Sequence, residues 1–357
     1  MRVGLILSLI SSFQIFQQTV ISELRFVDRK SLSFSLASAS FSLGQFISTL
    51  FLACQPISAR KGLVADAWLL IIGSVIAAAP RKFWSVMCVG RFLVGCGAGL
   101  GFVCSTLILY DSIPYSARPS HFLVLGLSFA FATVVINVTP LINIPDTGIL
   151  ILASVISASC GIIYLLLHPH PGFDSEGLQI ETYRSRPSSF PSTLVYVLMA
   201  LNVVRFVVSK SLTGNLWPEN NHLYHLYLSA VVPKFLIVGG YLVAVFIQAT
   251  LLLTSFYPYL PDEVRILSFL KFFLVSVPCN TALCLITEQF ASSNEQMTFA
   301  SRGRCVMWIL ATISTATFSW TMENYGFLIC FVPYVVVSTA LLLLLIWIYP
   351  KTELEII

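Results

Sequence analysis

The sequence predicts an all-α membrane protein, and three observations lead to that prediction. Of 357 residues, 57% are hydrophobic and 10% are charged, with a mean hydropathy of +0.87, whereas a soluble domain carries roughly a quarter charged residues. Eleven apolar segments are each long enough for a helix to span a bilayer core. A glycine-rich stretch, Gly90 to Val103, lies inside one of these segments. Lipid is therefore the expected surroundings of most of the chain.

Six of the predicted spans lie before residue 168. The first, near 3–21, begins with one arginine and a short apolar run, as a secretory signal peptide does. No small-residue cleavage site follows it, so we interpret it as a membrane span. The next five spans are expected near 31–54, 63–80, 84–110, 120–142 and 147–168. Short polar connectors separate these spans, so lipid-exposed backbone is confined to helices, as a bilayer requires.

A polar segment rich in proline and serine divides the chain into two parts. We place an N-terminal six-helix half at 1–168, a cytoplasmic linker at 169–190 and a C-terminal half at 191–357. The C-terminal spans are expected near 191–212, 235–260, 266–287, 299–320 and 326–349. With the amino terminus inside, ten Lys and Arg residues fall on the inner side and six on the outer side, which favours that orientation.

The glycine-rich stretch GRFLVGCGAGLGFV, residues 90–103, has two possible interpretations. Closely spaced glycines form loops around phosphates, and they also form the small-residue face of a buried helix. A phosphate loop needs a preceding strand and a helix start in fixed order, and the flanking sequence provides neither. Small residues let two helix backbones approach closely in a bilayer. We therefore predict that these glycines pack against neighbouring helices.

Seven segments, in chain order, resemble the motifs of one family. They are SSFQIFQQTVI (11–21), SFSLGQFISTLFLACQPISARKG (40–62), GRFLVGCGAGLG (90–101), YDSIPYSARPS (110–120), LLLHPHPGF (165–173), ITEQFASS (286–293) and YPKTELEII (349–357). Together they resemble the sugar porters of the major facilitator superfamily, and in particular the animal facilitative glucose transporters. The resemblance extends over nearly the whole chain.

This resemblance implies the major facilitator superfamily fold, with two six-helix halves and a solute site between them near the midplane. A segment resembling the family's ninth span starts at Pro233, about twenty residues after the seventh span. The apolar part of that interval, Leu223 to Val232, gives a helix of only about 15 Å against a core of about 30 Å. We therefore expect 11–12 transmembrane helices, with the eighth stunted or missing and the C-terminal half shortened near 213–233.

The candidate solute ligands are chosen from positions that match the family's central site and from one unusual charge. The seventh-span glutamine and asparagine cluster of the family is absent here. The matching candidates that remain are Gln17, Gln18, Asn280 and Trp308. Arg205 lies about twelve residues into the seventh span, where an arginine costs about 2.5–3.5 kcal/mol. Arg205 has two possible interpretations. It belongs to a changed central site that binds an anionic or other non-sugar solute, or its side chain extends to the membrane–water interface.

The resemblance also implies a set of ion pairs that close the inner side of the transporter. The residues in matching positions are Arg60, Arg91, Asp111, Arg118 and Glu288. Exchange of such pairs would switch access from one side of the membrane to the other. The simpler alternative is that these side chains only extend from helix ends toward water.

Two functions remain open at the level of the sequence. The first is a carrier that moves a hexose or a related small polar solute by facilitated diffusion. The alternative is a transport-incompetent paralogue that acts as a membrane interaction or sensor protein, which the lost hydroxyl-binding residues and the short segment favour. A multi-pass location in the plasma membrane follows from the family alone. The expected partners are a small-molecule solute and the lipid bilayer.

Other functional classes find no support in the residues. No Ser/His/Asp, Cys/His or paired-carboxylate arrangement predicts an enzyme, and we expect no cofactor. The pair His222 and His225 has no third ligand nearby in the sequence, so no metal site is predicted. The net charge of +4 is scattered, which gives no basic patch for nucleic acid.

Overall fold

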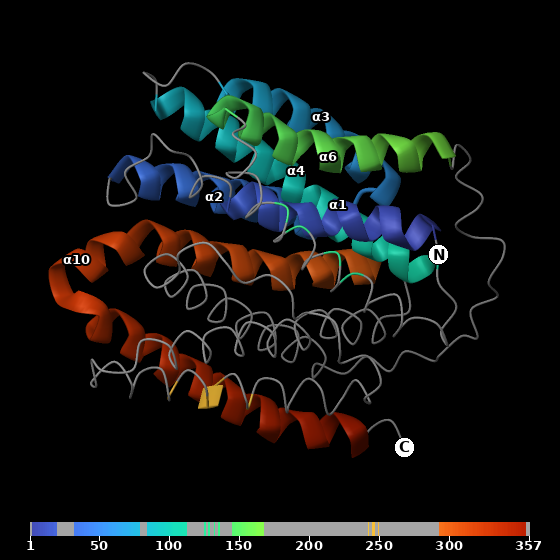
Figure 1. Ribbon diagram of the computed structural model, residues 1–357. Helices are drawn as coiled ribbons and strands as arrows, with labels where there is room; N and C mark the ends of the chain where they lie inside the picture. The colour runs from blue at the N-terminus through green and yellow to red at the C-terminus, as the bar shows by residue number, and fades with distance from the viewer. Residues whose placement is uncertain are drawn as a thin grey trace.

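The computed structural model describes residues 2–19, 32–78, 84–112, 145–167 and 293–354, with single positions in 125–135 and 242–249. Every regular element within these ranges is a helix, and no strand occurs among them. The helices are α1 (Arg2–Thr19), α2 (Leu32–Cys54), α3 (Ala59–Ala77), α4 (Trp84–Asp111), α6 (Asp146–Leu167) and α10 (Ser293–Leu354). Figure 1 shows α1 to α6 gathered in one bundle, with the first part of α10 lying along it.

Five of the predicted spans are helices in the structure. Four of them, α1, α2, α4 and α6, begin and end within two residues of the predicted positions. The third, α3, begins four residues before residue 63, because Ser58 caps its first turn by accepting a hydrogen bond from the Lys61 amide at 3.4 Å. Because this first turn is polar, the hydropathy of the sequence places the start of the helix too late. The linker 169–190, the spans between 191 and 287 and the short segment 213–233 lie outside the described residues.

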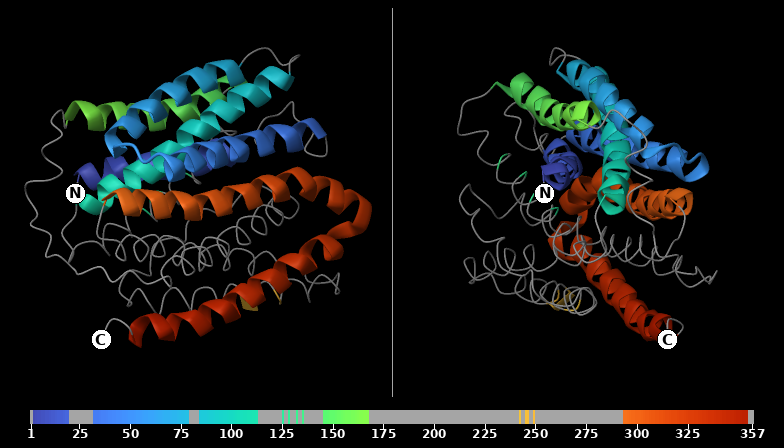
Figure 2. Two further views of the ribbon diagram at one scale, coloured as in Figure 1. Left: turned by 180° about the vertical axis from the view of Figure 1, so that it is seen from behind. Right: turned by 90° about the vertical axis from the view of Figure 1, so that its right-hand side faces the viewer.

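One predicted boundary is wrong. Instead of two spans separated near residues 321–325, α10 is helical over 62 residues. Such a helix is about 93 Å long if straight, three times the thickness of a bilayer core. Figures 1 and 2 show that α10 bends sharply, so that its two arms run in opposite directions. Gly326 and Pro333, in its middle part, are of the residue types that usually accompany such bends.

The glycines of α4 bring its backbone into contact with α2. A Cβ atom added to Gly95 would lie 2.9 Å from the carbonyl carbon of Phe41. On the facing helix, a Cβ added to Gly44 would lie 2.8 Å from the backbone nitrogen of Cys96. Real Cβ atoms do not approach heavy atoms this closely, so only glycine fits at either position.

The opposite side of α4 meets α3 in the same way. A Cβ atom added to Gly90 would lie 2.6 Å from the Cα of Ala77, and one added to Gly73 would lie 2.7 Å from the backbone nitrogen of Val94. The predicted small-residue face is therefore confirmed, and it is used twice, once toward each neighbour. Close backbone contact of this kind is what replaces the hydrophobic driving force between helices in lipid.

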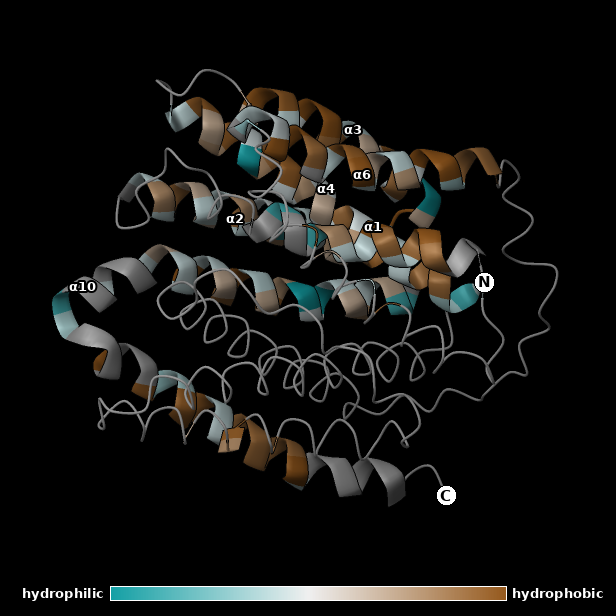
Figure 3. Cartoon of the chain, viewed as in Figure 1, coloured by the Kyte–Doolittle hydropathy of each residue, from teal (hydrophilic) through white to brown (hydrophobic). Residues whose placement is uncertain are grey.

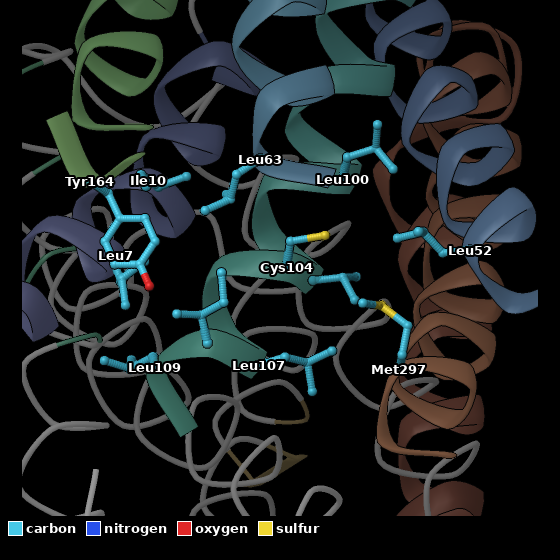
Figure 4. Packing of buried hydrophobic residues seen from close by; sticks show 12 residues of the cluster. Leu7, Ile10, Leu52, Leu63, Leu100, Cys104, Leu107, Leu109, Tyr164 and Met297 are labelled. Atoms are coloured by element: carbon cyan, nitrogen blue, oxygen red, sulfur yellow. The ribbon is translucent and has the colours of Figure 1, made fainter. Parts of the chain in front are cut away.

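Apolar side chains fill the space around these contacts. Figure 4 shows one cluster in which side chains from all six described helices meet near the end of α4. Its labelled members are Leu7, Ile10, Leu52, Leu63, Leu100, Cys104, Leu107, Leu109, Tyr164 and Met297. Because Met297 belongs to α10, this cluster ties the beginning of α10 to the N-terminal helices.

The outer surface of the bundle is apolar, as a lipid-facing surface must be. Trp68 and Val75 of α3 are 62% and 63% exposed, and Leu166 of α6 is 73% exposed. Figure 3 shows that much of α3 and α6 is brown, which marks hydrophobic residues. By length and composition, three helices among the described residues can cross a membrane: Ser33–Cys54, Trp84–Asp111 and Thr147–Leu167.

The close contact of α4 with α2 predicts a large effect from one methyl group. We expect Gly95→Ala to lower the free energy of unfolding by about 1–3 kcal/mol, because the added Cβ pushes against the backbone of α2. Titration with a denaturing detergent measures this change. The matched control is Gly161→Ala, since no atom lies within 4 Å of its added Cβ. Equal stabilities for the two variants would contradict the packing described above.

Candidate functional site

The second helix has its polar side inside and its apolar side outside. Five residues spaced three or four apart are at most 4% exposed: Ser35, Ser38, Ser42, Gln45 and Thr49. The opposite side is apolar and is between 38% and 51% exposed: Leu36, Leu43, Ile47, Leu50 and Phe51. Polar side chains in a membrane-spanning segment normally face the protein interior or a water-filled cavity. This arrangement therefore places lipid on one side of α2 and a polar interior on the other.

Polar groups of α1 and α4 face the same interior. The Gln45 amide nitrogen donates a hydrogen bond to the side-chain oxygen of Gln14 at 3.1 Å. The side-chain oxygen of Gln45 is buried and has no hydrogen-bond partner within the described helices. The hydroxyl groups of Ser11 and Ser105 lie 2.5 Å apart. We call these four residues, with Thr49, the polar band.

The first arm of α10, which begins at Ser293, closes this interior from the other side. The Cys305 thiol lies 3.5 Å from the Thr49 hydroxyl. The guanidinium of Arg304 lies over the ring of Phe102, 3.8 Å from its centroid. Trp308 is 2% exposed. Helices far apart in the sequence thus meet across a layer of hydrogen-bonding and aromatic side chains.

Arg91 joins the end of α1 to the beginning of α4. It is 1% exposed, donates a hydrogen bond to the carbonyl oxygen of Gln17, and lies over the Phe41 ring with 4.7 Å to the centroid. Arg91 precedes Asp111 by twenty residues on one helix, which is about 30 Å. Arg91 therefore lies near the beginning of α4 and Asp111 at its end.

Two other predicted gate residues do share an end of the bundle. Arg60 lies in the first turn of α3, and its guanidinium donates a hydrogen bond to the carbonyl oxygen of Leu165 on α6 at 3.3 Å. Asp111 is exposed at the end of α4. Since Gly62 of α3 lies against Cys104 of α4, the start of α3 and the end of α4 lie on the same side. The remaining gate residues, Arg118 and Glu288, lie outside the described residues.

Of the predicted solute ligands, Gln17 and Trp308 are buried in the described interior. Gln18 lies in α1, but only its place in the helix is described. Asn280 and Arg205 lie outside the described residues.

Four residues of the interior escaped the sequence analysis: Gln14, Gln45, Thr49 and Arg304. The regular spacing of serine, glutamine and threonine in α2 is the signal that could have revealed two of them.

The fold is shared with solved transporters at low sequence identity. The human organic anion transporter MFSD10 (TETRAN) matches with a TM-score of 0.66 and 15% identity, over 96% of this chain and 97% of that one. The proton:xylose symporter XylE bound to 6-bromo-6-deoxy-D-glucose matches with a TM-score of 0.69 and 14% identity, over 96% and 92%. The inward open conformation of XylE from E. coli gives 0.64 and 14%, over 95% of each chain.

These similarities show the major facilitator superfamily fold, and the long apolar helices indicate an integral membrane protein. Residues 3–169, slightly less than half of the chain, match the sugar (and other) transporter family. No curated protein sequence matches the chain significantly.

The contact between Gln14 and Gln45 predicts a measurable coupling. In a double-mutant cycle with Gln14→Leu and Gln45→Leu, we expect a coupling energy of about 0.5–1.5 kcal/mol, because each single change removes the same hydrogen bond. Denaturing titrations of the four proteins give this value. As a control, Gln45→Leu combined with Gly161→Ala should be additive. Additivity of the two glutamine variants would show that the bond contributes nothing.

Proposed function

We propose that this protein is a carrier that moves a hexose or a related small polar solute across a membrane by facilitated diffusion. The observation that carries the proposal is the polar band, enclosed between the N-terminal helices and the first arm of α10. The match of residues 3–169 to the sugar (and other) transporter family supports a solute of the sugar type. In the proposal the protein acts as a transporter and performs no chemical step.

The polar band suits a polyhydroxy solute because its side chains both donate and accept hydrogen bonds. A sugar hydroxyl does both, and a buried amide such as that of Gln45 offers an acceptor oxygen without a partner. Gln17 and Trp308 are buried in the same interior, and an indole ring offers an apolar surface with one donor. In this proposal Gln45 and Gln17 bind hydroxyl groups, and Trp308 contacts the ring of the solute.

Alternating access requires that the two sides of this interior move relative to each other. The described contacts between α10 and the N-terminal helices include a weak thiol bond from Cys305 to Thr49 and the stacking of Arg304 on Phe102. In contrast, α4 is joined to α2 and α3 by backbone contacts that leave no room for sliding. We therefore propose that α1 to α6 move as one body past α10.

Arg60 and Asp111 are the proposed gate residues at the end of the bundle where α3 begins. Arg60 is already bound to the backbone of α6, so it can hold helix ends together and release them. Arg118 and Glu288 complete this proposed gate. Arg91 takes a different role in the proposal, since its bond to the Gln17 carbonyl fixes the opposite end of α1 against α4. The plasma membrane is the proposed location.

Uptake into proteoliposomes tests this function. We expect saturable uptake of a labelled hexose, and we expect Gln45→Leu to raise its KM about tenfold, because one hydrogen bond to the solute is lost. The control is Trp68→Leu, which changes a side chain that is 62% exposed on the outer surface and should leave KM within about twofold.

Two results would contradict the proposal. Equal KM values for Gln45→Leu and the wild type would show that the polar band does not bind the solute. Absence of saturable uptake for hexoses and other small polar solutes would leave the alternative, a transport-incompetent membrane interaction or sensor protein.

A further inference from the structure

One carboxyl group is buried between α3 and α4, whereas the Gln45 side of the polar band lies where α2 meets α4. Asp66 lies seven residues after the start of α3, about 10 Å along the helix. The residue is 1% exposed, and neither of its side-chain oxygens has a hydrogen-bond partner among the residues that the structure describes. An isolated carboxylate in an apolar interior is so unfavourable that the group takes up a proton instead. Whether Asp66 is charged therefore depends on whether a neighbouring cation or hydrogen-bond donor can stabilise its carboxylate.

Asp66 fits against a glycine of α4. A Cβ atom added to Gly101 would lie 2.6 Å from Cγ and 2.9 Å from Oδ1 of Asp66. A Cβ added to Gly97 would lie 3.1 Å from the Asp66 backbone oxygen. The missing side chain of Gly101 therefore provides the space for the carboxyl group. We call this space beside Gly101 the Asp66 seat, and it exists only while α3 and α4 are packed together.

The ionisable groups near this seat offer no neutralising charge. Cys104 lies on α4 against Gly62, one turn before Asp66, and Cys160 and Tyr164 of α6 belong to the adjoining core cluster. On α3 itself, Arg60 donates to the Leu165 carbonyl of α6, and Lys61 is exposed. Both cations precede Asp66 by at least five residues.

A metal ion fits this seat poorly. Hard cations need several oxygen ligands around them, and the group that the structure places against the Asp66 carboxyl is Gly101, which has no side chain. Among the described residues, no group of three or more His, Cys, Asp or Glu side chains could hold a metal. The proton is the remaining ligand of a buried carboxylate.

We propose that Asp66 is a proton-binding site, which holds a proton while α3 and α4 are packed together and releases it to water when they separate. On release, the carboxyl O–H bond breaks, the proton passes to water and the carboxylate becomes hydrated. Acid then favours the packed arrangement, because the proton binds to that arrangement alone. In the carrier proposed above α3 and α4 move as one body, so pH would act through Asp66 on the stability of the bundle and not on the transport step.

Infrared spectroscopy of the reconstituted full chain tests the bound proton directly. We expect a protonated-carboxyl band in the wild type at neutral pH and its complete loss in Asp66→Asn, which keeps the shape of the neutral group. Asp66→Ser is a second variant in case the first fails to fold. The control is Asp111→Asn, an exposed residue, which should keep the band. Identical spectra of the wild type and both Asp66 variants at neutral pH would overturn the proposal.

Thermal unfolding between pH 5 and pH 8 tests the link to helix packing. A proton held only in the folded state makes stability fall as pH rises, so the wild-type Tm should fall by several degrees more than that of Asp66→Asn. Parallel curves for the two proteins would overturn the link. Neither measurement uses transport, so failed uptake leaves these results standing, and a missing infrared band leaves the carrier proposal intact.

Discussion

The described structure depends on the direct contact of α4 with two neighbouring backbones. In lipid, apolar side chains gain little by leaving their solvent, so helices associate through close packing and polar contacts. Gly95 meets α2 and Gly90 meets α3, and in both cases a single Cβ would force the helices apart. These contacts hold α2, α3 and α4 as one unit. They also fix which side of α2 and of α3 turns inward.

The two functional features follow from this packing. Gly99 of α4 lies against Gln45, so the approach of α2 sets the depth of the polar band. Gly101, half a turn further on, gives space to the Asp66 carboxyl. The same short stretch of glycines thus positions the proposed solute ligands on one side and the proposed proton site on the other. A change in the separation of these helices would affect both.

Three charged residues are buried in the described part of the chain, and they are accommodated by different means. Arg91 donates to a backbone carbonyl and lies over the Phe41 ring, and Arg304 lies over the Phe102 ring. An aromatic face attracts a cation, so a phenylalanine ring can stabilise a buried arginine where no acidic side chain is present. A carboxylate has no such partner among apolar side chains. Asp66 is therefore the buried charge that a proton must neutralise.

The sequence by itself determined the helical class, the spans of α1, α2, α4 and α6, and the packing role of the glycines, because hydropathy and residue size act locally along the chain. It failed at α10, where a polar break does not interrupt helical hydrogen bonds. It also missed Gln14 and Arg304, since their importance lies in partners distant in the sequence. Only the tertiary structure placed Arg60 against Leu165 and brought Thr49 to Cys305, because such contacts depend on how whole helices pack.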